Sequence, residues 1–332
     1  SDSPLRLTIQ CGRCDGMRAE IVVRVAGGVA PEGGALRLAG TLIGPQRGRD
    51  MTLPTTVPLI DLAAGAPAAV RADVAVARAV FTEPAYWTPE LPNLYRLEAR
   101  LLNGDTTIAS FDRLVGLRRL GIRGRSFWLD GRRWVPRGRA CSTACFDPQV
   151  LRGLHAAAVI ADPTPDTCSA ADRTGVAIVA RLHDQHDVPL DSSQAAERLA
   201  AWTLHPSVVL AVVPLSVPAE LAQRIAASAQ ALKGTILVGL EADGTQPPPD
   251  VPDGLAAVVD CFVVDLPRDG LPHDGWRSWR MEKPLVAQRA VAGGDMAEDR
   301  RECDRLQAAL AAWGLARGAT QLPWDWAGYC VS

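Results

Sequence analysis

Short segments that alternate apolar and polar residues fill the first 122 positions of the chain, and clusters of glycine and proline separate them. An alternation with a period of two is typical of strands that bury one face and expose the other. The segments with this pattern are residues 5–10, 19–26, 35–43, 70–77, 93–102 and 106–118. About seven short strands at such spacing predict an immunoglobulin-like β-sandwich over residues 1–122.

From residue 123 onward, short apolar runs alternate with segments of helical character. The strands that we expect are residues 133–137, 157–161, 176–181, 208–213, 235–240, 258–265, 285–288 and 319–322. The helices that we expect are residues 148–155, 193–204, 219–232 and 296–313. Eight strands in a strand–helix alternation predict a (β/α)8 TIM barrel over residues 123–332. Because the sequence ends about ten residues after the last expected strand, we expect a trimmed barrel that lacks its last helix.

Composition and charge narrow the class of protein. Of the 332 residues, 48% are hydrophobic and 22% are charged, which is typical of a globular chain with a large core. The net charge of −2, with acidic and basic residues well mixed, gives no reason to expect a nucleic-acid partner. Because no apolar run approaches the roughly 18 residues of a membrane helix, we expect no transmembrane segment.

Three stretches carry motifs of a known family, namely YWTPELPNLYRLEARL at 86–101, DRLVGLR at 112–118 and FWLDGRRWVPRG at 127–138. They resemble the end of the sandwich domain, the linker and the first barrel strand of glycoside hydrolase family 2, which includes β-galactosidases, β-glucuronidases and β-mannosidases. Weaker similarity follows at residues 157–179, 205–210, 283–287 and 318–326. The resemblance covers nearly the whole chain, and it implies a sandwich, a TIM barrel and a retaining glycosidase site.

The resemblance implies two catalytic glutamates, and this sequence has neither. The acid/base, which follows an asparagine just past the fourth strand, falls on Ser216, with Leu215 in place of the asparagine. The nucleophile at the end of the seventh strand falls on Arg289, or on Gln288 with a one-residue shift. A serine hydroxyl cannot protonate a leaving oxygen as a glutamic acid does, and neither an amide nor a guanidinium can form a glycosyl ester.

The family's second-strand Arg and His are also absent, around Ile160 and Pro163. Together these losses lead to the hypothesis of a non-catalytic, glycosidase-like pseudoenzyme. We expect a structural or scaffolding subunit of a larger protein complex, peripheral to a membrane, of which respiratory and photosynthetic assemblies are examples. One alternative is a lectin-like pseudoenzyme that binds carbohydrate. A second alternative is an active glycoside hydrolase with relocated carboxylates at the strand ends. These carboxylates are Asp162, Asp184, Glu241, Asp243, Asp265 and Asp325.

Two further groups of residues have side chains suited to binding. Four tryptophans could stack on sugars or contact a protein partner, namely Trp276, Trp279, Trp324 and Trp326. Packing in the core is the open alternative for all four. A loop after the third strand could bind a metal ion through His183, Asp184, His186 and Asp187. Because an H-x-x-H in an extended loop does not place both imidazoles on one face, we expect a solvated loop, no metal and no cofactor.

The eight cysteines, and a first residue that is serine instead of methionine, favour an exported protein, either periplasmic or extracellular. A zinc site would need two close pairs of cysteines, whereas the C-x-x-C and C-x-x-x-C pairs lie far apart in the sequence. We therefore expect about one to three disulfides, and we expect Cys261, inside an apolar run, to be a buried thiol. The candidate disulfide cysteines are Cys11, Cys14, Cys141, Cys145, Cys168, Cys303 and Cys330.

Overall fold

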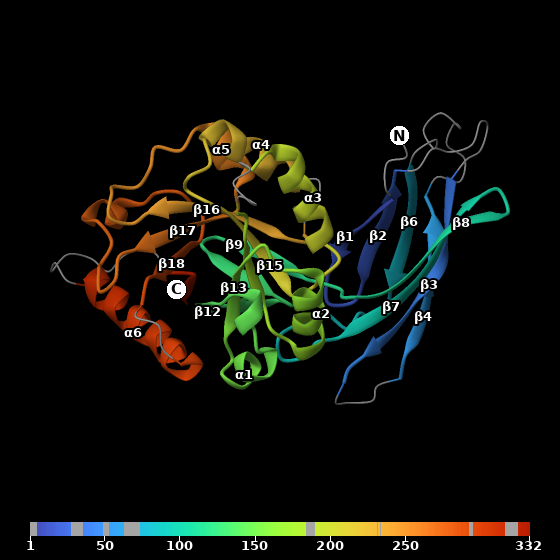
Figure 1. The fold of residues 1–332 in the computed structure, drawn as a ribbon, viewed down its shortest axis with the longest axis horizontal. Coiled ribbons are helices and arrows are strands. Elements are labelled where there is room, and N and C mark those ends of the chain that lie inside the picture. The colour runs from blue at the N-terminus through green and yellow to red at the C-terminus, as the bar shows by residue number, and fades with distance from the viewer. Residues whose placement is uncertain are drawn as a thin grey trace.

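A computed structural model describes residues 5–27, 36–48, 53–62, 74–183, 190–230, 232, 234–291, 295–315 and 325–332. An antiparallel β-sandwich forms the N-terminal part, and a closed barrel of parallel strands forms the C-terminal part. The two parts lie side by side in Figure 1, with the sandwich in blue and teal. This architecture confirms the fold class that the patterning predicts, a sandwich followed by a TIM barrel.

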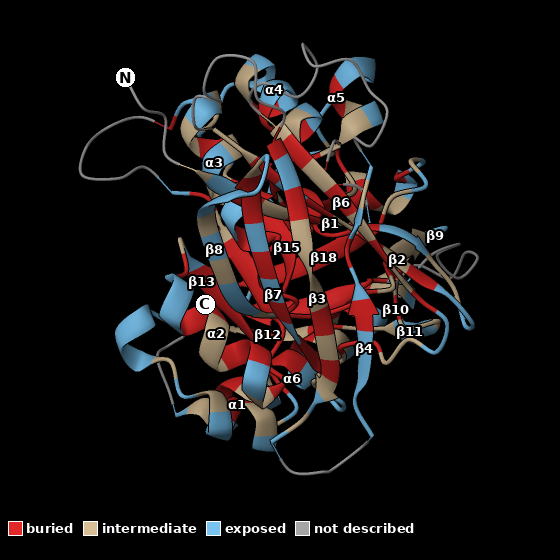
Figure 2. Cartoon of the chain, turned by 90° about the vertical axis from the view of Figure 1, so that its right-hand side faces the viewer, coloured by how far each residue is buried: buried red, intermediate tan, exposed pale blue. Residues whose placement is uncertain are grey.

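Two four-stranded sheets make up the sandwich. The first sheet contains, in spatial order, β1 (Arg6–Cys14), β2 (Ala19–Ala26), β6 (Val74–Phe81) and β5 (Ile60–Asp61). The second contains β4 (Thr55–Pro58), β3 (Leu36–Gln46), β7 (Leu94–Asn103) and β8 (Thr106–Val115). Alternate residues of β2, β6 and β7 are buried, so the facing sides of the two sheets share one apolar core (Figure 2).

A small antiparallel sheet of three strands connects the sandwich to the barrel. Its strands are β9 (Leu120–Arg123), β10 (Ser126–Leu129) and β11 (Arg132–Trp134). The expected first barrel strand at 133–137 is therefore wrong, because Trp134 ends β11 and the barrel begins with β12 (Arg137–Ala140). Pro136 lies between the two strands in the sequence. Because proline has no backbone N–H to donate to a neighbouring strand, it separates β11 from β12.

Eight parallel strands close the barrel. After β12 these are β13 (Ala157–Ala161), β14 (Ile178–Arg181), β15 (Val208–Val213), β16 (Leu237–Asp243), β17 (Cys261–Leu266), β18 (Leu285–Arg289) and β19 (Gly328–Val331). The strand expected at 319–322 falls outside the described residues. The eighth strand is instead β19, whose four residues are buried and pair with β18, and three of which also pair with β12.

Six α-helices of the described residues cover the outside of the barrel (Figure 1). They are α1 (Pro148–Gly153), α2 (Pro165–Thr174), α3 (Ser192–Trp202), α4 (Ala219–Gln230), α5 (Asp253–Val258) and α6 (Met296–Leu315). The four expected helices correspond to α1, α3, α4 and α6, with ends that differ by at most two residues. Side-chain oxygens of Asp147, Thr164 and Asp191 accept hydrogen bonds from the free N–H groups that begin α1, α2 and α3.

A fully buried arginine joins the sandwich to the barrel. The Arg118 guanidinium donates hydrogen bonds to the backbone oxygens of Thr203 at 3.1 Å, His205 at 3.1 Å and Val208 at 2.6 Å. These carbonyls belong to the segment that leads from α3 into β15. Because a buried guanidinium must find acceptors for its donors, Arg118 holds the start of β15 against the end of the sandwich.

The His-Pro-Ser sequence before β15 packs against α2 through Asp172. The Nδ1 atom of His205 lies 2.7 Å from Asp172 Oδ2, and the backbone N–H of Ser207 donates to Asp172 Oδ1 at 2.9 Å. The indole N–H of Trp87 in the sandwich donates to the backbone oxygen of Asp172 at 2.9 Å. The motifs that resemble the glycosidase family therefore serve here to connect the two domains.

All eight cysteines are free thiols in this structure, which does not contain the expected disulfides. Cys168, Cys261, Cys303 and Cys330 are buried among barrel strands and helices, and the Cys303 thiol donates to the backbone oxygen of Gly138 at 3.3 Å. Within the described residues, no helix is both long and apolar enough to cross a membrane.

Candidate active site at the mouth of the barrel

Polar side chains end the strands at one mouth of the barrel. The carboxyl ends of parallel strands meet at the same end of a barrel, where active sites of this fold lie. Side chains of Val179, Val263 and Val286 pack together inside the barrel. Because side chains alternate along a strand, the residues two positions further on also face the interior. These residues are Arg181 on β14, Asp265 on β17 and Gln288 on β18.

Glu241, on β16, lies at the centre of this polar layer. Its Oε1 atom forms a short ion pair with Nη2 of Arg181, and its Oε2 atom accepts a hydrogen bond from the backbone N–H of Leu215 at 3.2 Å. The Glu241 side chain is only 8% exposed, so these two contacts take the place of most of the hydrogen bonds that its carboxylate would form with water. The carboxylate is thereby held by the same chain segment in which the resemblance implies a catalytic Asn-Glu pair.

Asp265 stands next to Glu241 at the more solvent-exposed side of the mouth. Partial burial raises the pKa of Asp265, and the neighbouring negative charge of Glu241 raises it further. A hydrogen bond with the Gln288 side chain acts in the opposite direction and lowers the pKa of Asp265. A carboxyl group with a raised pKa beside a second, ion-paired carboxylate is the kind of arrangement that supports general acid chemistry.

The two residues proposed for the nucleophile position point in different directions. Gln288 is 4% exposed, pairs in register with Asp265 and faces the barrel interior. Arg289 faces outward to α6, where Nη2 lies 3.7 Å from Glu302 Oε2. Of the two, only Gln288 reaches the polar layer. Ser216, at the acid/base position, is exposed in the turn after β15.

The tryptophans expected near a binding surface are buried where the structure describes them. Trp276 is 0% exposed and Trp279 is 5% exposed, with ring centroids 5.3 Å apart, and Trp279 also meets Phe262 at 5.1 Å. Trp326 is 4% exposed and packs near Trp313. This burial is what the packing alternative predicts. Trp324 lies outside the described residues.

The loop expected as a possible metal site is described only at its first residue. Arg198 donates to the backbone oxygen of His183 at 2.6 Å and to both carboxylate oxygens of Asp162 at 3.0 Å. Asp184, His186 and Asp187 lie outside the described residues. Among the residues that the structure does describe, no group of three His, Cys, Asp or Glu side chains is placed to hold a metal ion.

The remaining strand-end carboxylates lie away from the polar layer or are bound locally. Asp243 Oδ1 accepts hydrogen bonds from the backbone and the hydroxyl of Thr245, at 2.8 Å and 2.6 Å. Asp325 lies 3.6 Å from Arg133. The residue that the sequence analysis missed is Arg181, which is the ion-pair partner of Glu241. An arginine that ends a buried strand opposite several strand-end carboxylates was the available signal.

Comparison with known proteins agrees with this architecture. The family model described as Glycosyl hydrolases family 2 matches residues 59–118, which lie in the sandwich part of the chain. No curated protein matches the chain. The resemblance inferred from the sequence motifs is thereby confirmed for the sandwich, and the solved structures extend it to the fold of the barrel.

Three solved structures illustrate the similarity. A glycosyl hydrolase family 2 member from Bacteroides cellulosilyticus matches 98% of this chain and 43% of its own, at 14% identity and a TM-score of 0.66. A β-glucuronidase from Bacteroides uniformis matches 98% of this chain and 45% of its own, at 17% identity and a TM-score of 0.63. A putative β-galactosidase from Bacteroides fragilis matches 79% of this chain and 42% of its own, at 15% identity and a TM-score of 0.55. The chain thus spans less than half the length of these proteins.

Proposed function

We propose that this chain is a glycosidase-like protein that does not hydrolyse glycosides and that serves as a structural subunit of a protein complex. The observation that carries the proposal is the chemistry at the two catalytic positions. Ser216 lies in an exposed turn, and Gln288 occupies the interior position at the end of β18. Retaining glycosidases need a carboxyl group at each of two positions about 5–5.5 Å apart.

The ion pair in the mouth supports the same proposal. Glu241 is the buried carboxylate nearest to these positions, and Arg181 and the backbone of Leu215 already bind its two oxygens. A carboxylate bound in this way would have to give up both contacts before it could attack a sugar. The polar layer therefore stabilises the barrel mouth in place of binding a substrate.

Exposed apolar side chains at the edge of the sandwich support a role in assembly. β5 is a two-residue edge strand, and Ile60 and Leu62 at this edge are 49% and 45% exposed. Leu53, just before β4, is 93% exposed. An exposed sheet edge with apolar side chains is suited to contact with a protein partner.

A second candidate function, a hydrolase with relocated carboxylates, is favoured by one observation. Glu241 and Asp265 lie on the adjacent strands β16 and β17, and the negative charge of Glu241 helps to raise the pKa of Asp265. In this alternative Asp265 would protonate the leaving oxygen, and Glu241 would act as the second carboxylate after release from Arg181. Both functions use the same pair of side chains, so one set of variants separates them.

The test is an activity screen of the purified chain against aryl β-galactosides, β-glucuronides and β-mannosides. We expect no turnover above that of a protein-free blank, either by the wild-type chain or by a matched Asp105→Asn control, whose substitution lies in the exposed turn between β7 and β8. Turnover that disappears in Asp265→Asn and in Glu241→Gln, but persists in Asp105→Asn, would replace the proposal with the relocated hydrolase.

The assembly role has its own test. Co-purification of the chain from its native source should yield a stoichiometric protein partner, and an Ile60→Ser/Leu62→Ser variant should lose that partner while keeping its thermal stability. A double variant that retains the partner unchanged would exclude the β5 edge as the contact. Calorimetry against a panel of glycans would identify the lectin-like alternative if it detected saturable heat.

A further inference from the structure

The C-x-x-C motif lies in a β-bulge at the end of β1. In the pairing with β2, Cys11 is opposite Ile21 and Cys14 is opposite Ala19, so three steps along β1 match two steps along β2. Residues three apart in a regular strand point to opposite faces of the sheet. The extra residue of the bulge returns Cys14 to the side of Cys11, where each thiol shifts the pKa of the other.

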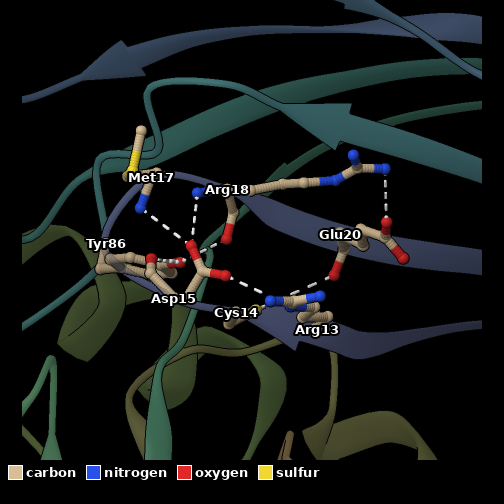
Figure 3. Close-up of polar contacts among 7 residues, drawn as sticks. All are labelled: Arg13, Cys14, Asp15, Met17, Arg18, Glu20 and Tyr86. Atoms are coloured by element: carbon tan, nitrogen blue, oxygen red, sulfur yellow. Dashed lines mark hydrogen bonds and ion pairs between the residues drawn. The ribbon is translucent and has the colours of Figure 1, made fainter.

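The two sulfurs differ in their exposure. Cys11 is buried at the junction with the barrel, where its backbone N–H donates to Thr235 Oγ1 at 2.7 Å. Cys14 is only partly buried, and its Sγ lies 3.9 Å from the backbone oxygen of Glu20 (Figure 3). A small molecule that approaches from solvent therefore reaches Cys14 first, with Cys11 directly behind it.

The turn after Cys14 holds the bulge in place. The Asp15 carboxylate accepts hydrogen bonds from the backbone N–H groups of Met17 at 2.9 Å and Arg18 at 2.8 Å (Figure 3). The Tyr86 hydroxyl donates to the backbone oxygen of Asp15 at 2.6 Å. These contacts fix the turn that follows Cys14, so Cys14 stays on the same side of β1 as Cys11 and no rearrangement is needed to bring the two residues together.

Local charge makes one sulfur of the pair reactive. The hydrogen bond from Cys14 lowers the pKa of Cys11 to about 6, with a further contribution from the positive charge of Arg118, although burial acts against both. The pKa of Cys14 is raised by its hydrogen bond to Cys11 and by burial, so Cys14 keeps its proton. At neutral pH the pair therefore holds one thiolate, that of Cys11, which can accept the proton of Cys14 when Cys14 attacks a disulfide.

We propose that Cys11 and Cys14 are a reversible oxidation site, at which a small disulfide of the glutathione class converts the two thiols to one intrachain disulfide. Cys14 attacks the incoming disulfide and releases one small thiolate, while its proton passes to the Cys11 sulfur. Cys11 then yields that proton to the released thiolate and attacks the Cys14 sulfur. The second small thiolate leaves, so two electrons have passed from the pair to the small disulfide.

Arg118 makes this disulfide easy to reduce. The buried guanidinium attracts the Cys11 thiolate, and oxidation replaces that thiolate with a neutral disulfide. A positive charge that stabilises the reduced form gives a more oxidising couple. Because Arg118 also binds the backbone that leads into β15, oxidation removes a favourable charge contact from the junction between the two domains.

Peptide mapping of the intact chain tests the proposal. The chain is equilibrated in buffers that range from reduced to oxidised glutathione, acid-quenched, alkylated and digested with trypsin. Cleavage after Arg13 separates Cys11, in residues 7–13, from Cys14, in residues 14–18, so only a disulfide keeps these two peptides together. We expect the linked pair to appear in oxidised glutathione and to disappear in reduced glutathione.

Two variants serve as controls. Cys14→Ser should abolish the linked pair, whereas a Cys141→Ser/Cys145→Ser variant should leave it unchanged. Oxidation should also lower the melting temperature of the wild-type chain by a few degrees and leave that of Cys14→Ser unaffected. Separate alkylated peptides in every buffer, a linkage that reduced glutathione does not break, or linkage of either residue to another cysteine would each overturn the proposal. The wild-type map decides this even if Cys14→Ser does not fold.

Discussion

Arg181 and Glu241 form an ion pair across the mouth of the barrel, although the strands that carry them are not neighbours. β15 lies between β14 and β16, so the contact crosses the barrel interior instead of following the sheet. The pair links two strands that share no backbone hydrogen bond. It lies at the end of the barrel where active sites of this fold occur, and it leads to the first prediction.

Glu241→Gln should destabilise the chain by about 1–3 kcal/mol in urea or guanidinium unfolding. The substitution leaves the Arg181 guanidinium, 33% exposed, without its anionic partner and weakens the contact with Leu215. Glu298→Gln is the matched control, because it removes a carboxylate that pairs with arginines on the exposed surface of α6. That control should change the stability much less, and equal effects would show that the mouth pair is no more than a surface contact.

Asp265→Asn should change how stability depends on pH. The pKa of Asp265 is raised in the folded state, so the folded state binds the proton of this carboxyl group more tightly than the unfolded state does. In the unfolded state the pKa of an aspartate is about 3.9. The wild-type chain therefore loses stability as pH rises from about 4 through the folded pKa, and the asparagine variant lacks this loss. Urea unfolding at pH 4 and pH 7 should show the variant gaining relative to wild type, whereas a constant difference would contradict the raised pKa.

Arg118→Ala should cost about 3–5 kcal/mol, the largest loss among these variants. The substitution removes a fully buried side chain and its three hydrogen bonds to the segment before β15. We also expect calorimetry to resolve separate transitions for sandwich and barrel, because Arg118 joins them. Arg113→Ala, at an exposed position of β8, should change stability by about 0.5 kcal/mol or less.

Gly116→Ala should destabilise the same junction by about 1–3 kcal/mol through overpacking. A Cβ atom at this position would lie 2.5 Å from Cγ of Pro206, a residue in the segment that leads into β15. Gly121→Ala is the control, since a Cβ atom there meets nothing within 4 Å. Thermal unfolding should show a lower midpoint for the first variant only. A stable Gly116→Ala protein would mean that the junction is loosely packed.

Local patterns were sufficient where burial follows from the residues themselves. The strand expected at Val208–Val213 has those bounds in the structure, because a run of six apolar residues fits a parallel strand that is covered on both faces. The expected strand at 319–322 was not the one that closes the barrel. β19 has only four residues, and its pairing with β12 makes it a strand. No periodicity in so short a segment shows which strand it will meet.

The site divides in the same way. The family resemblance implied Ser216 for the acid/base position and Arg289 or Gln288 for the nucleophile position, and only the structure shows that Gln288 faces the barrel interior while Arg289 faces α6. The burial of Trp276 and Trp279 could not be read from their spacing, because an irregular segment has no period. The thiols of Cys11 and Cys14 share a face only because β1 is bulged there.

Two kinds of repeating pattern, the order of sandwich and barrel, and the lack of glutamate at the two positions that the family resemblance implies all follow from the sequence alone. These properties depend on residues close together in the chain, where side-chain periodicity carries the information. Three contacts require the folded chain: Arg181 pairs with Glu241, Arg118 binds the segment that leads into β15, and Cys14 lies on the same side of β1 as Cys11. Those contacts depend on strand register and barrel closure, which bring together groups that no local pattern relates.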